Sequence, residues 1–257
     1  MLGDTCGART FHAFYFCRLA TTNLSPLCFS IFVAFAVLLA ALGFYPAARY
    51  QSIPPPPPTA HLWYAYFLGN RGRFEESLAE SRRAHELDPL SLMANSTVGW
   101  AFYFARQYDK AIDHLKKTLD IDPHFWVAND YLGRAYYQKG MYDEAIVAFQ
   151  KANVVAPNTP IVIAELGCAY AVSGKKREAQ AALDTLTELS KRRYVPAYVF
   201  AVVYSGLGEK DRAVEWLKQA YEERSAIFSY LEAEPMFDGL GSDPRVTRML
   251  KDMGLPP

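Results

Sequence analysis

A period of 34 residues constrains the fold of this 257-residue chain more than any other feature of its sequence. Three residue types keep this interval over about 150 residues, which chance does not produce. The small residues are Ser77, Ala111, Ala145, Ala179 and Ala213. The prolines are Pro89, Pro123 and Pro157, and the glycines are Gly72, Gly140, Gly174 and Gly208, with Arg106 in the remaining glycine slot. The sequence therefore predicts an array of one repeated structural unit.

The clearest unit reads YLGRAYYQKGMYDEAIVAFQKANVVAP, residues 131–157, and its apolar residues recur at helical spacing on both sides of a glycine. Gly133 and Ala145 are small enough for the two helices to approach closely, while Phe149 fills the space beside them. Ala148 lies away from that contact in this register. Pro157 ends the unit, because proline cannot donate a backbone hydrogen bond and disfavours helical geometry in the preceding residue. Each unit is thus predicted to be a helical hairpin with a proline stop.

The pattern resembles the tetratricopeptide repeat family in its period and in its order of Leu-Gly, Tyr, Ala, Phe, Ala and Pro positions. The resemblance covers about residues 59 to 224 and implies an all-α, right-handed superhelical solenoid of helix-turn-helix hairpins. The predicted solenoid, 59–226, divides into units 59–91, 92–125, 126–159, 160–193 and 194–226. In the fourth unit Lys191 stands where proline is expected, and Pro196 follows five residues later. The second helix of that unit is therefore expected to run longer or to turn differently.

Residues 227–257 are expected to form a C-terminal cap, because a solenoid exposes an apolar face at each end. Ser242 or Asp243 can cap a short helix that begins at Pro244 and stops at Gly254. One face of that helix would carry Val246, Met249, Leu250 and Met253. This tail, with SKRRYV at 190–195, is similar to the C-terminal repeat region of bacterial membrane-linked multidomain signalling proteins. Their kinase, cyclase or winged-helix domains are not expected in this sequence, so none of their activities is carried over.

An uncharged segment precedes the repeats. Residues 27–45 follow an N-terminal segment, 1–26, and at ~1.5 Å per residue they can cross a hydrocarbon core of ~30 Å. They are predicted to form one transmembrane helix. The alternatives are a cleaved secretory signal peptide, or a misassigned start that leaves residues 1–26 without meaning.

A proline-rich linker, 46–58, joins this segment to the repeats. Its prolines 54–58 favour an extended, semi-rigid spacer of about 15 Å, and a docking site for a proline-recognising domain is the alternative. Arg9 and Arg18 precede the predicted span and Arg49 follows it, which favours a cytoplasmic N-terminus. The repeats would then lie on the outer, periplasmic side of a single-pass membrane protein. Signal cleavage would instead make the protein secreted or periplasmic.

No residues are arranged for catalysis, cofactor binding or metal binding. The five histidines are scattered, with neither HExxH nor paired-cysteine spacing. Cys168 is expected to be a buried structural thiol rather than a nucleophile. With 27 basic and 27 acidic residues and a pI near 7.0, the chain has no bias towards nucleic acid. Lys116 and Lys117 are expected on a solvated outer face.

In the family that the sequence resembles, positions 2, 5, 9, 12 and 13 of each first helix usually face a concave groove. Leaving aside position 2, these are Ser96, Trp100, Tyr103 and Phe104 in the second unit, and Asp130, Arg134, Tyr137 and Gln138 in the third. Aromatic rings beside an arginine suit peptide binding. The alternative is that Trp100 and Phe104 pack against neighbouring helices. The Lys and Asn clamp with which some family members hold chaperone C-termini is absent.

These features predict a membrane-anchored, non-enzymatic scaffold that binds a protein or peptide in the concave groove. The alternative is a regulatory or sensory module that acts with a separate catalytic or DNA-binding protein. An enzyme with an unrecognised site is disfavoured, because no convergent acid, base and nucleophile are found.

Overall fold

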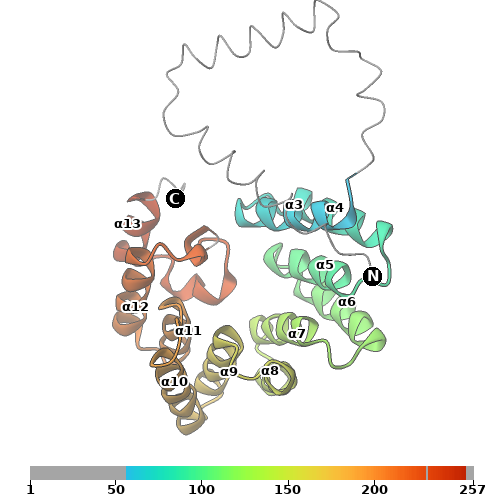
Figure 1. Cartoon of the computed structure of the whole chain (residues 1–257). Helices are drawn as coiled ribbons and strands as arrows, with labels where there is room; N and C mark the ends of the chain where they lie inside the picture. Colours follow the sequence, from blue (N-terminus) through green and yellow to red (C-terminus); the bar gives the residue numbers. More distant parts are fainter. Residues whose placement is uncertain (1–55, 230, 253–257) are drawn as a thin grey trace, which may run out of the picture. The chain divides into compact units, whose positions relative to one another are not determined.

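The computed structural model describes residues 56–229 and 231–252, and every regular element in these residues is helical. Five consecutive hairpins form the array (Figure 1). Their first helices are α3 (Pro58–Asn70), α5 (Leu92–Phe104), α7 (Trp126–Gln138), α9 (Pro160–Val172) and α11 (Tyr198–Gly206). Their second helices are α4 (Phe74–Leu87), α6 (Tyr108–Ile121), α8 (Tyr142–Val155), α10 (Lys176–Ser190) and α12 (Lys210–Glu222). The prediction of an all-α array of helical hairpins is confirmed.

The 34-residue period of the sequence sets the positions of the helices. The starts of α3, α5, α7 and α9 lie 34 residues apart, and so do the starts of all five second helices. Glycine ends the first helix in four hairpins, for example Gly140 with a φ of 73°, a left-handed conformation that glycine adopts without strain. Arg106 adopts the same conformation, with a φ of 58°, in the hairpin that lacks this glycine. A β-carbon makes that conformation costly, so other contacts of Arg106 must hold it there.

Prolines separate the first hairpins, as the sequence predicts. Helices α4, α6 and α8 each end two residues before their proline. Two asparagines that lie one repeat apart each bind one of these loops. Asn95 Nδ2 donates to the Pro89 carbonyl at 2.8 Å, and Asn129 Nδ2 donates to the Pro123 carbonyl at 3.0 Å. These bonds tie each loop to the helix that follows it.

Small residues let the helices of a hairpin meet. A β-carbon added to Gly133 would lie 2.6 Å from Phe149 Cδ1, so α7 and α8 are in contact there, as predicted. Ala145 is fully buried. Ala148, which the sequence places away from this contact, is also buried, with only 4 % of it exposed. It lies beside the side chains of α6 and α7 on the outer side of the array.

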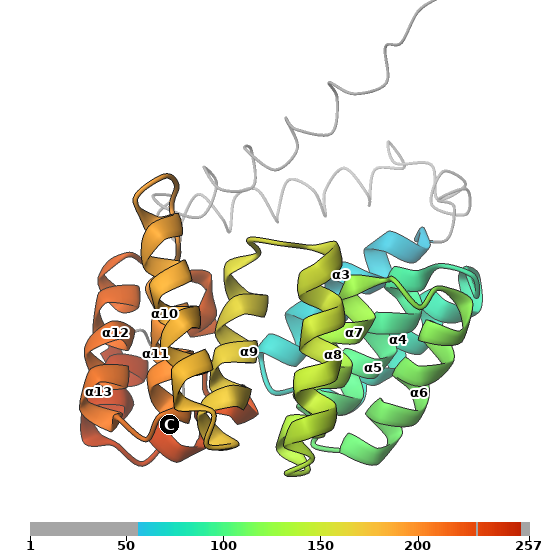
Figure 2. The same cartoon turned by 90° about the horizontal axis from the view of Figure 1, so that it is seen from below.

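The fourth hairpin differs from the others where the sequence pattern breaks. Without a proline at position 191, α10 runs to 15 residues, one more than α8. The following helix, α11, begins only after Pro196 and has nine residues, whereas α9 has 13. The expected lengthening of the second helix is confirmed. Seen from below, α8, α9 and α10 stand side by side in chain order (Figure 2).

The chain after α12 forms two 3-10 helices, η2 (Ala226–Ser229) and η3 (Pro235–Leu240), and then α13 (Pro244–Asp252). The Asp243 carboxylate accepts the backbone N–H of Arg245 at 2.9 Å, so α13 begins where the sequence predicts. Its residues Val246, Met249 and Leu250 are buried, while Met253 and Gly254 lie outside the described residues. We call residues 226–240 the C-terminal segment. It lies inside the arc of helices, on the side that the first helices face (Figure 1).

None of the helices described between residues 56 and 252 combines the length and the apolar character needed to cross a membrane. The predicted transmembrane helix, 27–45, and nearly all of the predicted linker, 46–58, lie outside the described residues. Their membrane role stays a prediction.

Candidate binding site on the concave side

A cavity of about 610 Å³ opens between the first helices of the array. We call it the aromatic pocket, because six rings line it: Trp63, Tyr66, Trp100, Phe104, Trp126 and Tyr131. Its polar lining residues are Thr59, Asn70, Asp130 and Arg134. Helices α3, α5 and α7 supply these side chains, and α9 adds Ile161. The pocket therefore lies on the concave side, in the N-terminal half of the array.

The walls of the aromatic pocket hold one another in place. The Tyr66 ring meets Trp100 edge to face at 4.6 Å between centroids, and Trp100 lies 4.6 Å from Phe104. The Tyr66 hydroxyl is hydrogen-bonded to the Thr97 hydroxyl at 3.2 Å. A β-carbon on Gly69 would lie 2.4 Å from Trp100 Cη2, so this glycine of α3 makes room for the indole. Trp63 stands at the rim, and 74 % of it is exposed.

The structure brings some of the predicted groove residues together and separates others. Trp100, Phe104, Asp130 and Arg134 line the aromatic pocket. Ser96 and Tyr103 are fully buried, and Tyr137 and Gln138 are half-buried beyond the pocket. The packing alternative also holds for Trp100 and Phe104, because both are at least nine-tenths buried against neighbouring helices. Their role in binding a partner stays a prediction.

The sequence prediction misses several residues that line the pocket. Most of them lie at the groove-facing positions 2, 5, 9, 12 and 13 of first helices, which the prediction applied to only two helices and without position 2. Residues at positions 2, 5, 9 and 13 of α3 all line the pocket: Thr59, Leu62, Tyr66 and Asn70. Residues at the omitted position 2 of the next three first helices also line it: Met93, Val127 and Ile161. Trp63, Trp126 and Tyr131 occupy other positions, so the groove-facing positions alone do not identify them.

A buried ion cluster lies at the inner end of the pocket. Arg134 on α7 contacts three carboxyl groups: Asp130 one turn earlier, Glu165 on α9 and Glu234 in the C-terminal segment. The nitrogen–oxygen distances are 3.3, 2.6 and 3.4 Å respectively. The buried Tyr103 hydroxyl donates to Glu234 Oε1 at 2.5 Å. One arginine therefore joins α7, α9 and the C-terminal segment.

Burial disfavours the charged form of one acid in this ion cluster. It raises the pKa of the Glu165 carboxyl well above its usual range, while Arg134 lowers it and Asp130 raises it. Asp130 Oδ1 and Glu165 Oε2 are both buried without a hydrogen-bond partner in the described residues. The raised pKa favours a proton on Glu165.

The C-terminal segment closes the concave side beyond the aromatic pocket. Glu234 caps η3 by accepting the Met236 backbone N–H at 3.2 Å. Arg106 forms a paired ion contact with Asp238, at 2.6 and 2.9 Å, which holds its left-handed turn. A small cavity of about 10 Å³ lies between this segment and α7, α9 and α11. The chain's own segment thus occupies the part of the concave side that a partner would otherwise contact.

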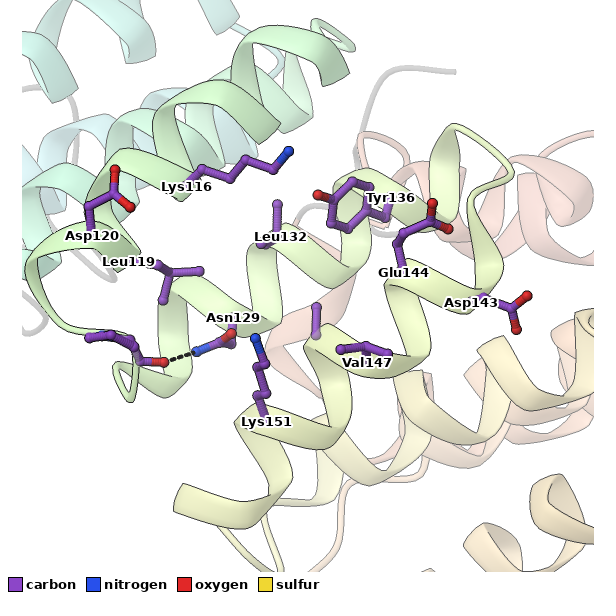
Figure 3. A pocket seen from close by; sticks show the side chains of 12 residues that line it. Lys116, Leu119, Asp120, Asn129, Leu132, Tyr136, Asp143, Glu144, Val147 and Lys151 are labelled. Atoms are coloured by element: carbon purple, nitrogen blue, oxygen red, sulfur yellow. Dashed lines mark hydrogen bonds between the residues drawn. The ribbon is translucent and has the colours of Figure 1, made fainter.

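A second cavity, about 700 Å³, lies on the outer side between α6, α7 and α8 (Figure 3). Its charged residues are mixed in sign: Lys116, Asp120, Asp143, Glu144 and Lys151. Lys116, which lines this cavity, and Lys117 are both exposed, as predicted. The Asn129 amide that binds the Pro123 carbonyl forms part of the wall, so this cavity is largely the groove between two hairpins. It carries no convergent chemistry.

Comparisons with known proteins agree with this architecture. Family models described as tetratricopeptide repeat match residues 105–166 and 197–227. A thermophilic tetratricopeptide repeat protein from Thermus thermophilus has 18 % identity, a TM-score of 0.55, and coverage of 70 % of this chain and 98 % of its own. This likeness shows the fold. No curated protein gave a significant match.

Two further solved structures are more distant. A tetratricopeptide repeat protein from Parabacteroides merdae has 12 % identity and a TM-score of 0.46, with 78 % of this chain and 80 % of its own covered. YrrB, described as having an unusual peptide-binding site, has 21 % identity and a TM-score of 0.40, with 67 % and 89 % covered. The similarity to bacterial membrane-linked signalling proteins is not tested by these comparisons and stays a prediction.

Replacing Glu165 with Gln is expected to stabilise the protein more at pH 7 than at pH 5. The folded-state pKa of Glu165 is raised from about 4.5, so folding takes up a proton above that pH and wild-type stability falls as pH rises. Glutamine is neutral throughout, so the variant should gain up to about 1.4 kcal/mol per pH unit. Urea unfolding at pH 5, 6 and 7 measures this, with the exposed Glu144→Gln as the control. A pH-independent offset for Glu165→Gln would show that Glu165 is charged in the folded protein.

Proposed function

Because the chain belongs to the tetratricopeptide repeat family, we propose that it is a non-enzymatic scaffold that binds a protein or peptide partner in the aromatic pocket. Such repeats generally bind proteins or peptides. One observation supports this site as the binding site. The aromatic pocket is an open, apolar part of the concave side, whereas the C-terminal segment lies over another part of that side. Rigid rings at the edge of a cavity provide large contact area at low entropic cost.

The character of the reactive groups supports a non-enzymatic role. Burial raises the pKa of the Cys168 thiol to about 12, so this cysteine is a poor nucleophile, in keeping with the predicted structural thiol. In the described parts of the chain, no three His, Cys, Asp or Glu side chains are grouped to hold a metal ion.

The proposal places the scaffold at a membrane through residues 27–45, with the repeats on the outer side. Its support is the uncharged sequence of this segment and the arginines that flank it. The protein should then remain in the membrane fraction after carbonate washing. Recovery as a soluble protein with a mature N-terminus near residue 49 would show a cleaved signal peptide instead.

Trp63→Ala is expected to weaken partner binding, while Tyr64→Ala is expected to change it little. Both side chains are exposed and neighbours on α3, but only Trp63 lines the aromatic pocket. Dodecapeptides selected from a phage-displayed random library on the full chain provide the ligands, and fluorescence anisotropy gives their Kd. Removing Trp63 should raise the Kd about 30-fold, near 2 kcal/mol, which is the scale of an interface hot spot.

Circular dichroism must show that both variants keep their helical content. Equal effects of the two substitutions on the selected peptides would place the binding surface elsewhere.

The regulatory alternative, in which the module serves a separate catalytic or DNA-binding protein, remains a second prediction. That function would also require a site that binds a protein partner.

A further inference from the structure

We infer that the aromatic pocket accepts a segment of the partner that carries a lysine or arginine, and that the cationic group of this side chain lies against Asp130. This inference rests on the proposed binding function and names the chemistry of the ligand. Three features of the pocket carry it: the charge at its inner end, the position of the Asp130 carboxylate, and the kind of walls that enclose it.

The inner end of the pocket carries excess negative charge. Arg134 supplies one positive charge, whereas Asp130, Glu165 and Glu234 are three acids around it. The acids of the cluster outnumber its one guanidinium, even when Glu165 is counted as neutral because of its raised pKa. Among the residues that line the pocket, only Asp130 and Arg134 are charged. Buried charge is costly unless it is balanced, so an entering cation is favoured and an entering carboxylate is repelled.

Asp130 is the acid that a ligand can reach. Its side chain is only 4 % exposed, yet it lines the aromatic pocket. Arg134 Nε lies 3.3 Å from Asp130 Oδ2, whereas Oδ1 accepts no hydrogen bond from any N–H group in the described residues. An ammonium or guanidinium group at this end of the pocket would bring a charged donor to the Asp130 carboxylate.

The pocket walls suit the rest of a basic side chain. The faces of aromatic rings attract cations within about 6 Å, and tryptophan attracts them most strongly. The pocket lining already shows this arrangement, because the Arg134 guanidinium lies 5.5 Å from the centroid of the Tyr131 ring. The methylene stem of lysine or arginine buries well against apolar rings. A cavity of about 610 Å³ exceeds one such side chain, so apolar residues beside the basic one are expected to enter as well.

The test uses the dodecapeptides selected on the full chain whose binding depends on Trp63. These peptides should be enriched in lysine or arginine next to apolar residues. In a synthetic peptide, replacing that arginine with citrulline removes the charge but keeps the shape. The change should weaken binding to the wild-type protein about tenfold or more, the value of one charged hydrogen bond.

Asp130→Asn should remove most of this discrimination between arginine and citrulline, and Asp120→Asn, at the outer cavity, should leave it intact. The citrulline exchange on wild-type protein stands by itself if Asp130→Asn does not fold. Trp63-dependent peptides that lack a basic residue, or that bind equally well with citrulline, would overturn the inference while the proposed function stands. Failure to select any Trp63-dependent peptide would overturn the proposed function and this inference with it.

Discussion

The arrangement of the concave side depends on the ion cluster around Arg134. This side chain lies on the middle helix pair of the array and contacts acids from α7, from α9 and from the C-terminal segment. Such a cluster is weak evidence for net stability, because desolvating the charges offsets much of their attraction. The effect of the cluster is on the position of the C-terminal segment. With its partners in place, Arg134 fixes where the C-terminal segment crosses the concave side, and so fixes which part of that side remains open.

Arg134 therefore has a different role from the one that the sequence suggests. The groove interpretation treats it as a residue that a partner contacts. In the structure its three carboxyl contacts are all within the chain, and removing the guanidinium would leave buried acids without a counter-charge. In the proposed binding function, its influence on a partner would act through Asp130 and through the C-terminal segment. Arg106 likewise makes its ion contact within the chain. It occupies the left-handed turn that lacks glycine, and its guanidinium pairs with Asp238.

Local patterns in the sequence were enough to predict the helices, because each hairpin is built from contacts within about 34 residues. Gly133 against Phe149 and the proline stops are contacts of this kind. The path of the C-terminal segment could not be predicted in this way. Its anchors join residues 100 or more positions apart, as in the Tyr103–Glu234 hydrogen bond and the Arg134–Glu234 and Arg106–Asp238 pairs. A cap was expected at 227–257, but nothing local in that stretch shows that part of it turns inward.

Hydrogen exchange in the C-terminal segment tests most directly whether this segment occupies the concave side. The Met236 and Phe237 backbone N–H groups donate to Glu234, through its carboxylate and its carbonyl. Exchange measured by mass spectrometry on a peptide covering 231–240 should be as slow as that of α7. Glu234→Gln should speed it there without affecting α3, α4 or α6. Exchange of this peptide at the rate of an unstructured chain in the wild-type protein, with α7 and α9 still protected, would contradict the account.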